Sequence, residues 1–148
     1  MSIKCIFCDI VRGVEKAYTL YRSNGILVIL DKYPVSKGHL LVLSEDHYES
    51  VHEAPPEVTA KVWLTASALA RIFRVNLKAP GVNIITNSGA TAGQEIYHFH
   101  VHVIPRWEPL RRFWSNRHTL TEEEAREVID TIKDHTILID EYLQALGL

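Results

Sequence analysis

The chain has 148 residues, a formal net charge of −2 at pH 7 and a composition that is 47% hydrophobic and 23% charged. This length allows one sizeable core but not two catalytic domains, so we expect a single domain over residues 1–148. The nearly balanced charge argues against a protein that coats nucleic acid or a membrane surface. A local arginine cluster could still bind phosphate, and it comprises Arg106, Arg111, Arg112 and Arg117.

The apolar runs of the sequence are short, and its first residues do not resemble an export signal. The longest runs, residues 26–30 and 40–43, fall far below the about 20 residues that a membrane-spanning helix needs. The start lacks the positive charge, long apolar stretch and cleavage site of a secretory signal. We therefore expect a cytoplasmic protein with no membrane partner. In a reducing compartment, the Cys-x-x-Cys spacing of Cys5 and Cys8 is typical of a metal clip or a redox pair.

The first third of the chain predicts three strands. Residues 18–22 and 25–31 read as two strands, and Ser23-Asn24-Gly25 between them is a strong turn signal, so we expect a β-hairpin. Residues 33–38 contain Pro34 and Gly38 and indicate a loop. Residues 39–44 are rich in Leu and Val and predict the third strand.

Two long helices and two further strands follow. Pro55-Pro56 opens the first helix, which the spacing of its apolar residues extends to about residue 78. Residues 82–87 predict a fourth strand, and residues 88–94 form a loop that leads into a histidine-rich strand. The second helix starts at Thr121, which with Glu124 matches a capping box, and its apolar stripe continues to Leu146. This order predicts an α+β fold: a mostly antiparallel sheet with one inserted long helix and one C-terminal helix.

The most unusual feature of the sequence is the placement of His98, His100 and His102 at every second position. Side chains alternate faces along a strand, so the three imidazoles would share one face and the apolar residues between them the other. With an ordinary pKa of about 6.5, histidine serves near neutral pH as nucleophile, acid, base or metal ligand. Burying three imidazoles without partners costs several kcal/mol, whereas exposing them costs little, and the alternation alone allows both orientations.

Two kinds of chemistry fit such a triplet. Three histidines can hold a catalytic zinc ion that keeps an open position for water. An imidazole is also a nucleophile toward phosphorus, forming a covalent intermediate that water then resolves. The preceding loop contains Gly89, Gly93 and Gln94, which bring backbone N–H groups and an amide toward an anion. This loop favours phosphate chemistry.

Residues 98–104 match the signature of the histidine triad (HIT) family, His-φ-His-φ-His-φ-φ with φ apolar, and the chain resembles that family of nucleotide hydrolases and transferases. The resemblance extends to residues 5–10, to Asp31 with residues 34–39, and to residues 87–102. It covers residues 5 to about 106, which we take as the family core. Residues 107–148 form a C-terminal extension, whose helix we expect to cover the sheet or extend a dimer contact.

The resemblance implies a role for each site residue. His100 would attack the α-phosphorus of a purine nucleotide, and His102 would hydrogen-bond the phosphate or the leaving-group oxygen. His39 would lie beside the catalytic histidine and order the phosphate site. The substrate-binding residues implied are Asp31 for the ribose hydroxyls, Asn87 and Gln94 for phosphate or the leaving group, and Phe7, Ile26 and Leu27 as an apolar wall around the base.

The resemblance also separates the first triad histidine from the other two. Zinc-containing members of the family hold a structural ion with two cysteines, a histidine after the third strand and the first triad histidine. Here these positions are Cys5, Cys8, His47 and His98. Four such ligands are what a closed tetrahedral zinc site needs. No organic cofactor is implied.

The activity implied is hydrolysis of a phosphoanhydride or phosphoramidate bond at the α-phosphate of purine nucleotides, such as dinucleoside polyphosphates or adenylyl conjugates, by a homodimer with a nucleotidyl-histidine intermediate. Glu95 stands where the phosphoramidase branch commonly has serine, and residues 102–107 resemble members that cleave dinucleoside polyphosphates. Two alternatives stay open: a nucleotidyltransferase or phosphorylase that uses phosphate as the acceptor, and a nucleotide-responsive binding protein with incidental hydrolysis. Nucleic acid is not an expected partner.

Overall fold

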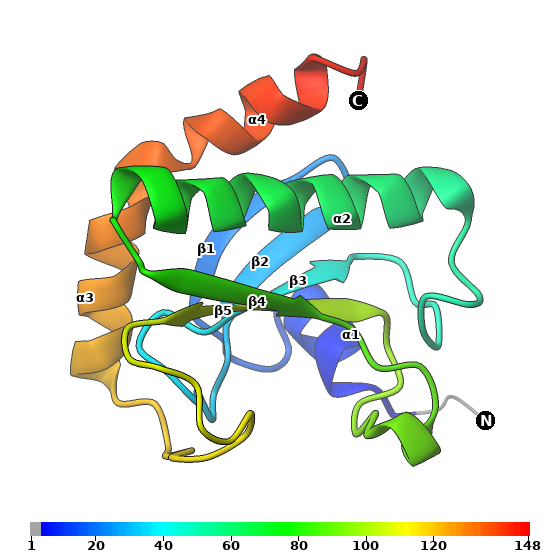
Figure 1. Ribbon diagram of the computed structural model, residues 1–148. Coiled ribbons are helices and arrows are strands. Elements are labelled where there is room, and N and C mark those ends of the chain that lie inside the picture. The colour runs from blue at the N-terminus through cyan, green and yellow to red at the C-terminus, as the bar shows by residue number, and fades with distance from the viewer. Residues whose placement is uncertain (1–3) are drawn as a thin grey trace.

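A computed structural model describes residues 4–148, and its centre is one antiparallel five-stranded sheet (Figure 1). The strands follow the spatial order β1-β2-β3-β5-β4, and every neighbouring pair is antiparallel. Their bounds are β1 (Thr19–Ser23), β2 (Ile26–Leu30), β3 (Leu40–Ser44), β4 (Gly81–Ile85) and β5 (His100–Arg106). The predicted α+β fold with a mostly antiparallel sheet is confirmed.

Helices cover both faces of the sheet. The long helix α2 (Pro56–Arg71) lies across one face and continues into a π-helical turn at Ile72–Asn76, whereas α1 (Ile6–Val11) lies on the other face (Figure 1). The C-terminal part contains α3 (Glu122–Ile132), a 3-10 turn at Lys133–His135, and α4 (Ile137–Gln144), which packs on α2. A further 3-10 turn, Ala90–Ala92, interrupts the loop between β4 and β5.

Strand alternation divides the buried side chains between two clusters. In β2, Val28 packs into the large core under α2, whereas Ile29 belongs to the smaller cluster beside α1. In β5, Val101 and Val103 enter the large core, so His100 and His102 point to the α1 face. The apolar residues of the motif therefore anchor the strand in the core. The histidines of the strand face the side of the sheet that α1 covers only in part.

The structure corrects three expectations about local structure. The C-terminal helix is not continuous, because α3 runs beside the end of α2 while α4 crosses over it, and one straight helix cannot follow both directions (Figure 1). Helix α1 is absent from the sequence prediction, since six residues are too few to show a helical period. Strand β5 begins at His100, so His98 precedes the strand rather than belonging to it.

Within residues 4–148, each helix is too short or too polar to cross a lipid bilayer.

Candidate functional site

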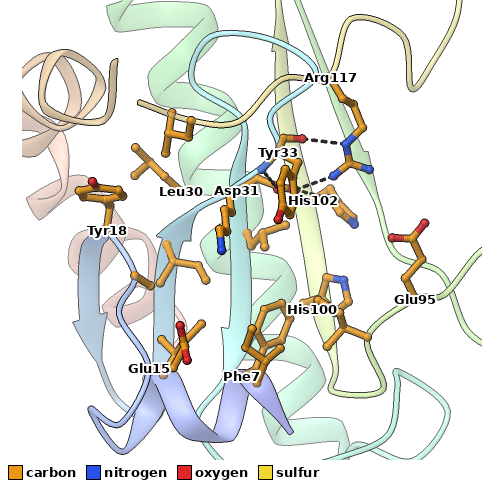
Figure 2. A pocket seen from close by; sticks show the side chains of 18 of the residues that line it. Phe7, Glu15, Tyr18, Leu30, Asp31, Tyr33, Glu95, His100, His102 and Arg117 are labelled. Carbon is orange, nitrogen blue, oxygen red and sulfur yellow. Dashed lines mark hydrogen bonds and ion pairs between the residues drawn. The ribbon is translucent and has the colours of Figure 1, made fainter. Parts of the chain in front are cut away.

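A cleft of about 700 Å³ opens on the α1 face of the sheet, and His100 and His102 form part of its wall (Figure 2). One part of the cleft is apolar and is lined by side chains of α1, β2 and β3 with the segment before β1. The opposite part carries polar and charged side chains from β5 and from the segment after it. The apolar lining consists of Ile6, Phe7, Ile10, Ala17, Tyr18, Ile29, Leu30 and Leu41.

Most predicted site residues line this cleft, but two of the apolar ones do not. Ile26 is 1% exposed and belongs to the core under α2, on the opposite face of the sheet. Leu27 is also 1% exposed and is covered within the small cluster beside α1. The expected wall of Ile26 and Leu27 is therefore wrong, because β2 presents Ile29 and its neighbour Leu30 to the cleft instead. Phe7 does line the cleft.

The hydrogen bonds of His100 leave one ring nitrogen available. Its Nδ1 lies 2.6 Å from the carbonyl oxygen of His98 and donates to it, so the proton is assigned to Nδ1. Nε2 then carries a lone pair and has no hydrogen-bond partner among residues 4–148. Burial lowers the pKa of His100, which keeps the ring neutral. A neutral imidazole with a free Nε2 is the nucleophilic form of histidine.

His102 is held by a second histidine behind it. The backbone N–H of Val35 donates to Nδ1 of His39 at 3.1 Å, which assigns the His39 proton to Nε2. That Nε2 lies 2.9 Å from Nδ1 of His102 and donates to it, so His102 carries its own proton on Nε2. Burial is the main cause that lowers the pKa of each ring to about 3. His102 is thus a neutral hydrogen-bond donor toward the cleft.

The turn before β3 places His39 behind His102. Gly38 has a φ of 97°, and a side chain there would meet Pro105 at 3.1 Å, so the turn requires glycine. The backbone N–H of His39 donates to the carbonyl oxygen of Ser36 at 3.2 Å. His39 is 1% exposed and does not line the cleft itself. It therefore reaches a substrate only through His102.

Asp31 lies at the end of β2, where it connects several polar groups. The backbone N–H of Tyr33 donates to its Oδ1 at 2.7 Å. Its Oδ2 lies 3.3 Å from Nε2 of His39, 3.9 Å from Nδ1 of His102 and 3.5 Å from Nη2 of Arg117. Asp31 also lines the cleft, where its carboxylate can accept hydrogen bonds from a ligand.

Asn87 and Gln94 both line the cleft, but their amides differ in availability. The side chain of Gln94 accepts from the Gly89 N–H at 2.8 Å and donates to the carbonyl oxygens of Glu49 and Ile96 at 2.7 Å and 3.1 Å. Its polar atoms are occupied by backbone groups and hold the loop in shape. Among residues 4–148, the Asn87 side chain makes only a long hydrogen bond of 3.5 Å to a backbone carbonyl, so its amide can bind a ligand.

A second cluster joins the N-terminus to the sheet and could hold a metal ion. The Sγ atoms of Cys5 and Cys8 and the Nδ1 atoms of His47 and His98 all lie within 4.8 Å of one another. Nε2 of His98 donates to the carbonyl oxygen of Ser44 at 2.6 Å, which leaves Nδ1 as a lone pair facing the cysteines. Burial lowers the pKa of His98 to about 4, and the neutral ring is the form that binds metals.

Two cleft residues with contacts near the triad were not predicted individually. Trp114 packs edge-on to His102 with ring centroids 5.2 Å apart, and Arg117 lies beside it with Cζ 5.5 Å from the indole centroid. Both follow β5 in an irregular segment without strand or helix periodicity. The only sequence signal was the arginine cluster, and the structure disperses it: Arg117 lines the cleft, whereas Arg106, Arg111 and Arg112 do not.

Comparisons with known proteins identify the family of this chain. A family model described as the HIT domain matches residues 12–108. The adenylylsulfatase HINT3 of Arabidopsis thaliana is 36% identical over 145 residues, which cover 93% of this chain and 72% of that protein. A hypothetical histidine triad nucleotide-binding protein from Sulfolobus tokodaii has a similar structure, with a TM-score of 0.80, 32% identity, and coverage of 90% of this chain and 92% of that one.

A zinc-bound histidine triad family protein from Mycobacterium smegmatis has a TM-score of 0.76 and 33% identity, covering 93% of this chain and 96% of that one. The two structures share the fold described above, and the family match spans every strand of the sheet. The chain therefore belongs to the histidine triad family, as its His98–His102 motif predicts.

Proposed function

We propose that this protein is a nucleotide hydrolase that cleaves a phosphoanhydride or phosphoramidate bond at the α-phosphate of purine nucleotides, through a nucleotidyl-His100 intermediate. The observation that carries the proposal is the pair of opposite hydrogen-bond roles in one cleft. Nε2 of His100 offers a lone pair, and Nε2 of the neighbouring His102 offers a proton for a hydrogen bond. A nucleophile beside a donor suits displacement at phosphorus.

The first step forms a bond between Nε2 of His100 and the α-phosphorus, while the bond from phosphorus to the leaving group breaks. The leaving group takes the bonding electron pair, and an amine leaving group also takes a proton from water. The positive charge that develops on the ring is stabilised by the His98 carbonyl oxygen at Nδ1. In the second step a water oxygen attacks the phosphorus, the N–P bond breaks, and its electron pair returns to Nε2. The water releases one proton to solvent, and the product is a nucleoside monophosphate.

The remaining cleft residues suit the rest of a nucleotide. Asp31 would accept hydrogen bonds from the ribose hydroxyls, because it lines the cleft and a carboxylate has lone pairs beyond those used by its protein partners. The base would lie against Phe7 and its apolar neighbours. Asn87 would bind phosphate with its free amide, and Gln94 would support the loop whose backbone borders the phosphate site.

We also propose that the second cluster holds a structural zinc ion, with Cys5, Cys8, His47 and His98 as ligands and no organic cofactor. Tetrahedral zinc, with bonds of about 2.3 Å to sulfur and 2.0–2.1 Å to nitrogen, separates S and N ligands by about 3.5 Å. The Sγ–Nδ1 distances are 3.4 Å for Cys5–His98, 3.4 Å for Cys8–His47 and 3.6 Å for Cys8–His98. These distances match a zinc site whose ligands are already in place.

The test is replacement of His100. We expect His100→Ala to lower the turnover of adenylyl sulfate or a dinucleoside polyphosphate by at least about a thousandfold, because the variant lacks the nucleophilic nitrogen. AMP should still bind, because the other residues of the cleft are unchanged. Mass spectrometry of the acid-sensitive intermediate in the unmodified protein should locate the nucleotidyl group on His100. Full activity of the variant would contradict the mechanism. His135→Ala, on the C-terminal 3-10 turn, is a matched control.

Added inorganic phosphate distinguishes the acceptor. A hydrolase yields only the nucleoside monophosphate, whereas formation of a nucleoside diphosphate would show transfer to phosphate instead of water. The cytoplasmic location and the homodimer expected from the sequence stay predictions.

A further inference from the structure

The segment of residues 107–120, which we call the strap, borders the triad end of the cleft and lies almost entirely beyond the family match. Its first residue, Trp107, donates from Nε1 to the carbonyl oxygen of Lys37 at 2.8 Å. Its last residue, Leu120, donates from its backbone N–H to the carbonyl oxygen of Lys32 at 2.8 Å. Both ends are thus fixed to the loop between β2 and β3, and Trp114 and Arg117 from the middle of the strap line the cleft.

Arg117 in the strap has hydrogen-bond donors to spare. Its Nε donates to the carbonyl oxygen of Tyr33 at 2.8 Å, and its Nη2 lies 3.5 Å from Oδ2 of Asp31 (Figure 2). A guanidinium group has five N–H donors, and the other N–H groups of Arg117 make no hydrogen bond with residues 4–148. The side chain is 33% exposed and lines the cleft, so these donors are available to a ligand.

The position of Arg117 continues the line of catalytic groups. The ring centroids of His100 and His102 are 5.1 Å apart, and those of His102 and Trp114 are 5.2 Å apart. The guanidinium of Arg117 lies over the Trp114 ring, with Cζ 5.5 Å from its centroid. Figure 2 shows His100, His102 and Arg117 in this order along one side of the cleft. A group that leaves the phosphorus at His100 and extends past His102 therefore comes within reach of Arg117.

Arg117 supplies a positive charge that the neutral histidines beside it do not. His39 and His102 are neutral at pH 7, so they offer hydrogen bonds without positive charge. The other basic side chains that line the cleft, Lys16 and Lys32, lie over the rings of Tyr18 and Tyr33, whereas Arg117 lies over the ring of Trp114, which contacts His102. Neutral His39 and His102 are weak acids toward a departing amine, whereas sulfate leaves as a stable anion without a proton.

We propose that Arg117 binds the leaving group of the substrate and selects one that carries negative charge, such as sulfate or phosphate, over a neutral amine. The proposal rests on the hydrolytic function proposed above and names the substrate class of the same site. Glu95 lines the same end of the cleft with the opposite charge, so the guanidinium also offsets the repulsion between that carboxylate and an anionic substrate (Figure 2).

The test compares two ligands that share the adenosine and the α-phosphate but differ in the leaving group: adenylyl sulfate and adenosine 5′-phosphoramidate. Binding is measured by calorimetry in the His100→Ala background, where neither ligand is consumed. Adding Arg117→Gln should weaken binding of adenylyl sulfate by on the order of tenfold to a hundredfold, the size of a lost hydrogen bond between charged groups. The phosphoramidate should lose less than about fivefold.

The matched control is Arg111→Gln, which removes the same charge from an exposed strap residue that does not line the cleft. It should weaken both ligands by less than about fivefold. Equal losses of both ligands with Arg117→Gln would overturn the proposal, because Arg117 would then act only by holding Asp31. Unchanged binding of adenylyl sulfate would overturn it as well.

Turnover of the two compounds by the unmodified protein tests the hydrolase proposal separately. If neither compound is hydrolysed, the hydrolase proposal fails, while the difference in binding still decides whether Arg117 recognises the charge of the leaving group.

Discussion

The three triad histidines share one spacing but have three different environments. His98 is fully buried, directs Nδ1 to the two cysteines and donates from Nε2 to a backbone carbonyl. His100 donates from Nδ1 and keeps Nε2 free, whereas His102 accepts at Nδ1 and keeps the proton on Nε2. The difference comes from neighbours remote in sequence, because Ser44 and His39 decide which nitrogen of His98 and His102 carries the proton.

We expect His39 to act as a positioning residue, so that its loss should lower kcat much more than it raises KM. His39→Ala removes the donor to Nδ1 of His102, which lets the His102 ring turn and choose the other tautomer. We expect kcat for adenylyl sulfate to fall about tenfold or more, with KM changed much less, because His39 does not touch the cleft. Steady-state kinetics with circular dichroism as a folding check measures this. A rise in KM with kcat unchanged would contradict the role.

The buried histidines should make the protein sensitive to acid. Burial lowers the folded-state pKa of His39 and His102 to about 3, from an ordinary value of 6.5. The unfolded chain therefore binds protons that the folded one does not, so the stabilisation is complete above pH 6.5 and is lost as the pH falls toward 3. Urea unfolding from pH 7.5 to 4 should show a steeper loss of stability for the unmodified protein than for His39→Gln. Equal slopes would argue against this assignment.

At the scale of elements, α1 connects the candidate metal cluster to the cleft. Cys5 and Cys8 flank Phe7, whose ring packs edge-on to His98 and His100 with centroids 5.7 Å and 5.1 Å apart. Such a short helix is marginal on its own, so its position depends on what holds its first turn. Anchoring at the cysteines therefore places Phe7, part of the apolar lining of the cleft, next to His100.

Loss of one cysteine tests this anchoring. Burial and the neighbouring Cys5 raise the pKa of Cys8 to about 11, so zinc must displace protons as it binds. We expect Cys8→Ser to lower the zinc content below one ion per chain. The free energy of unfolding should fall by on the order of several kcal/mol. Plasma mass spectrometry and chemical unfolding measure the two effects, and a chelator should reproduce them in the unmodified protein. Retention of one zinc by the variant would contradict the ligand set.

The start of α3 forms only half of the predicted capping box. The Glu124 N–H donates to Oγ1 of Thr121 at 3.1 Å, as predicted, but the Glu124 carboxylate accepts from Nε2 of His118 at 2.7 Å instead of returning to the cap. Thr121→Ala should therefore cost about 1 kcal/mol in chemical unfolding. Thr119→Ala, two residues before the cap, is the control and should cost less than about 0.5 kcal/mol. Equal effects of the two variants would argue against the cap.

At the scale of the whole molecule, the sheet described by residues 4–148 has β1 and β4 as its two edge strands, each with a strand neighbour on one side only. An edge strand presents unpaired N–H and C=O groups that a second chain can pair with. An edge strand is therefore one of the surfaces at which the homodimer expected from the sequence could form. Sedimentation equilibrium should give twice the chain mass of 16.9 kDa, and a mass of one chain would contradict it.

Much of this architecture could be predicted because its signals are local. Turn residues bounded β1 and β2, the Pro55-Pro56 pair marked the start of α2, and the two-residue period of the triad gave the faces of β5. Side chains that alternate along a strand obey a rule that needs no knowledge of the partner strand. The break between α3 and α4 was not predictable in this way, because it depends on how the C-terminal residues pack against α2.

The sequence by itself determined the family, the α+β fold and the spacing of the triad, since each depends on residues close together in the chain. Only the tertiary structure decided which apolar residues reach the cleft, which triad nitrogen is free, and which arginine lines the cleft. These depend on contacts between residues as far apart as the 93 positions from Cys5 to His98. A residue's type and spacing indicate what chemistry it can do. Its partners across the fold decide which atom carries the proton, how far the side chain is buried and whether a substrate can reach it.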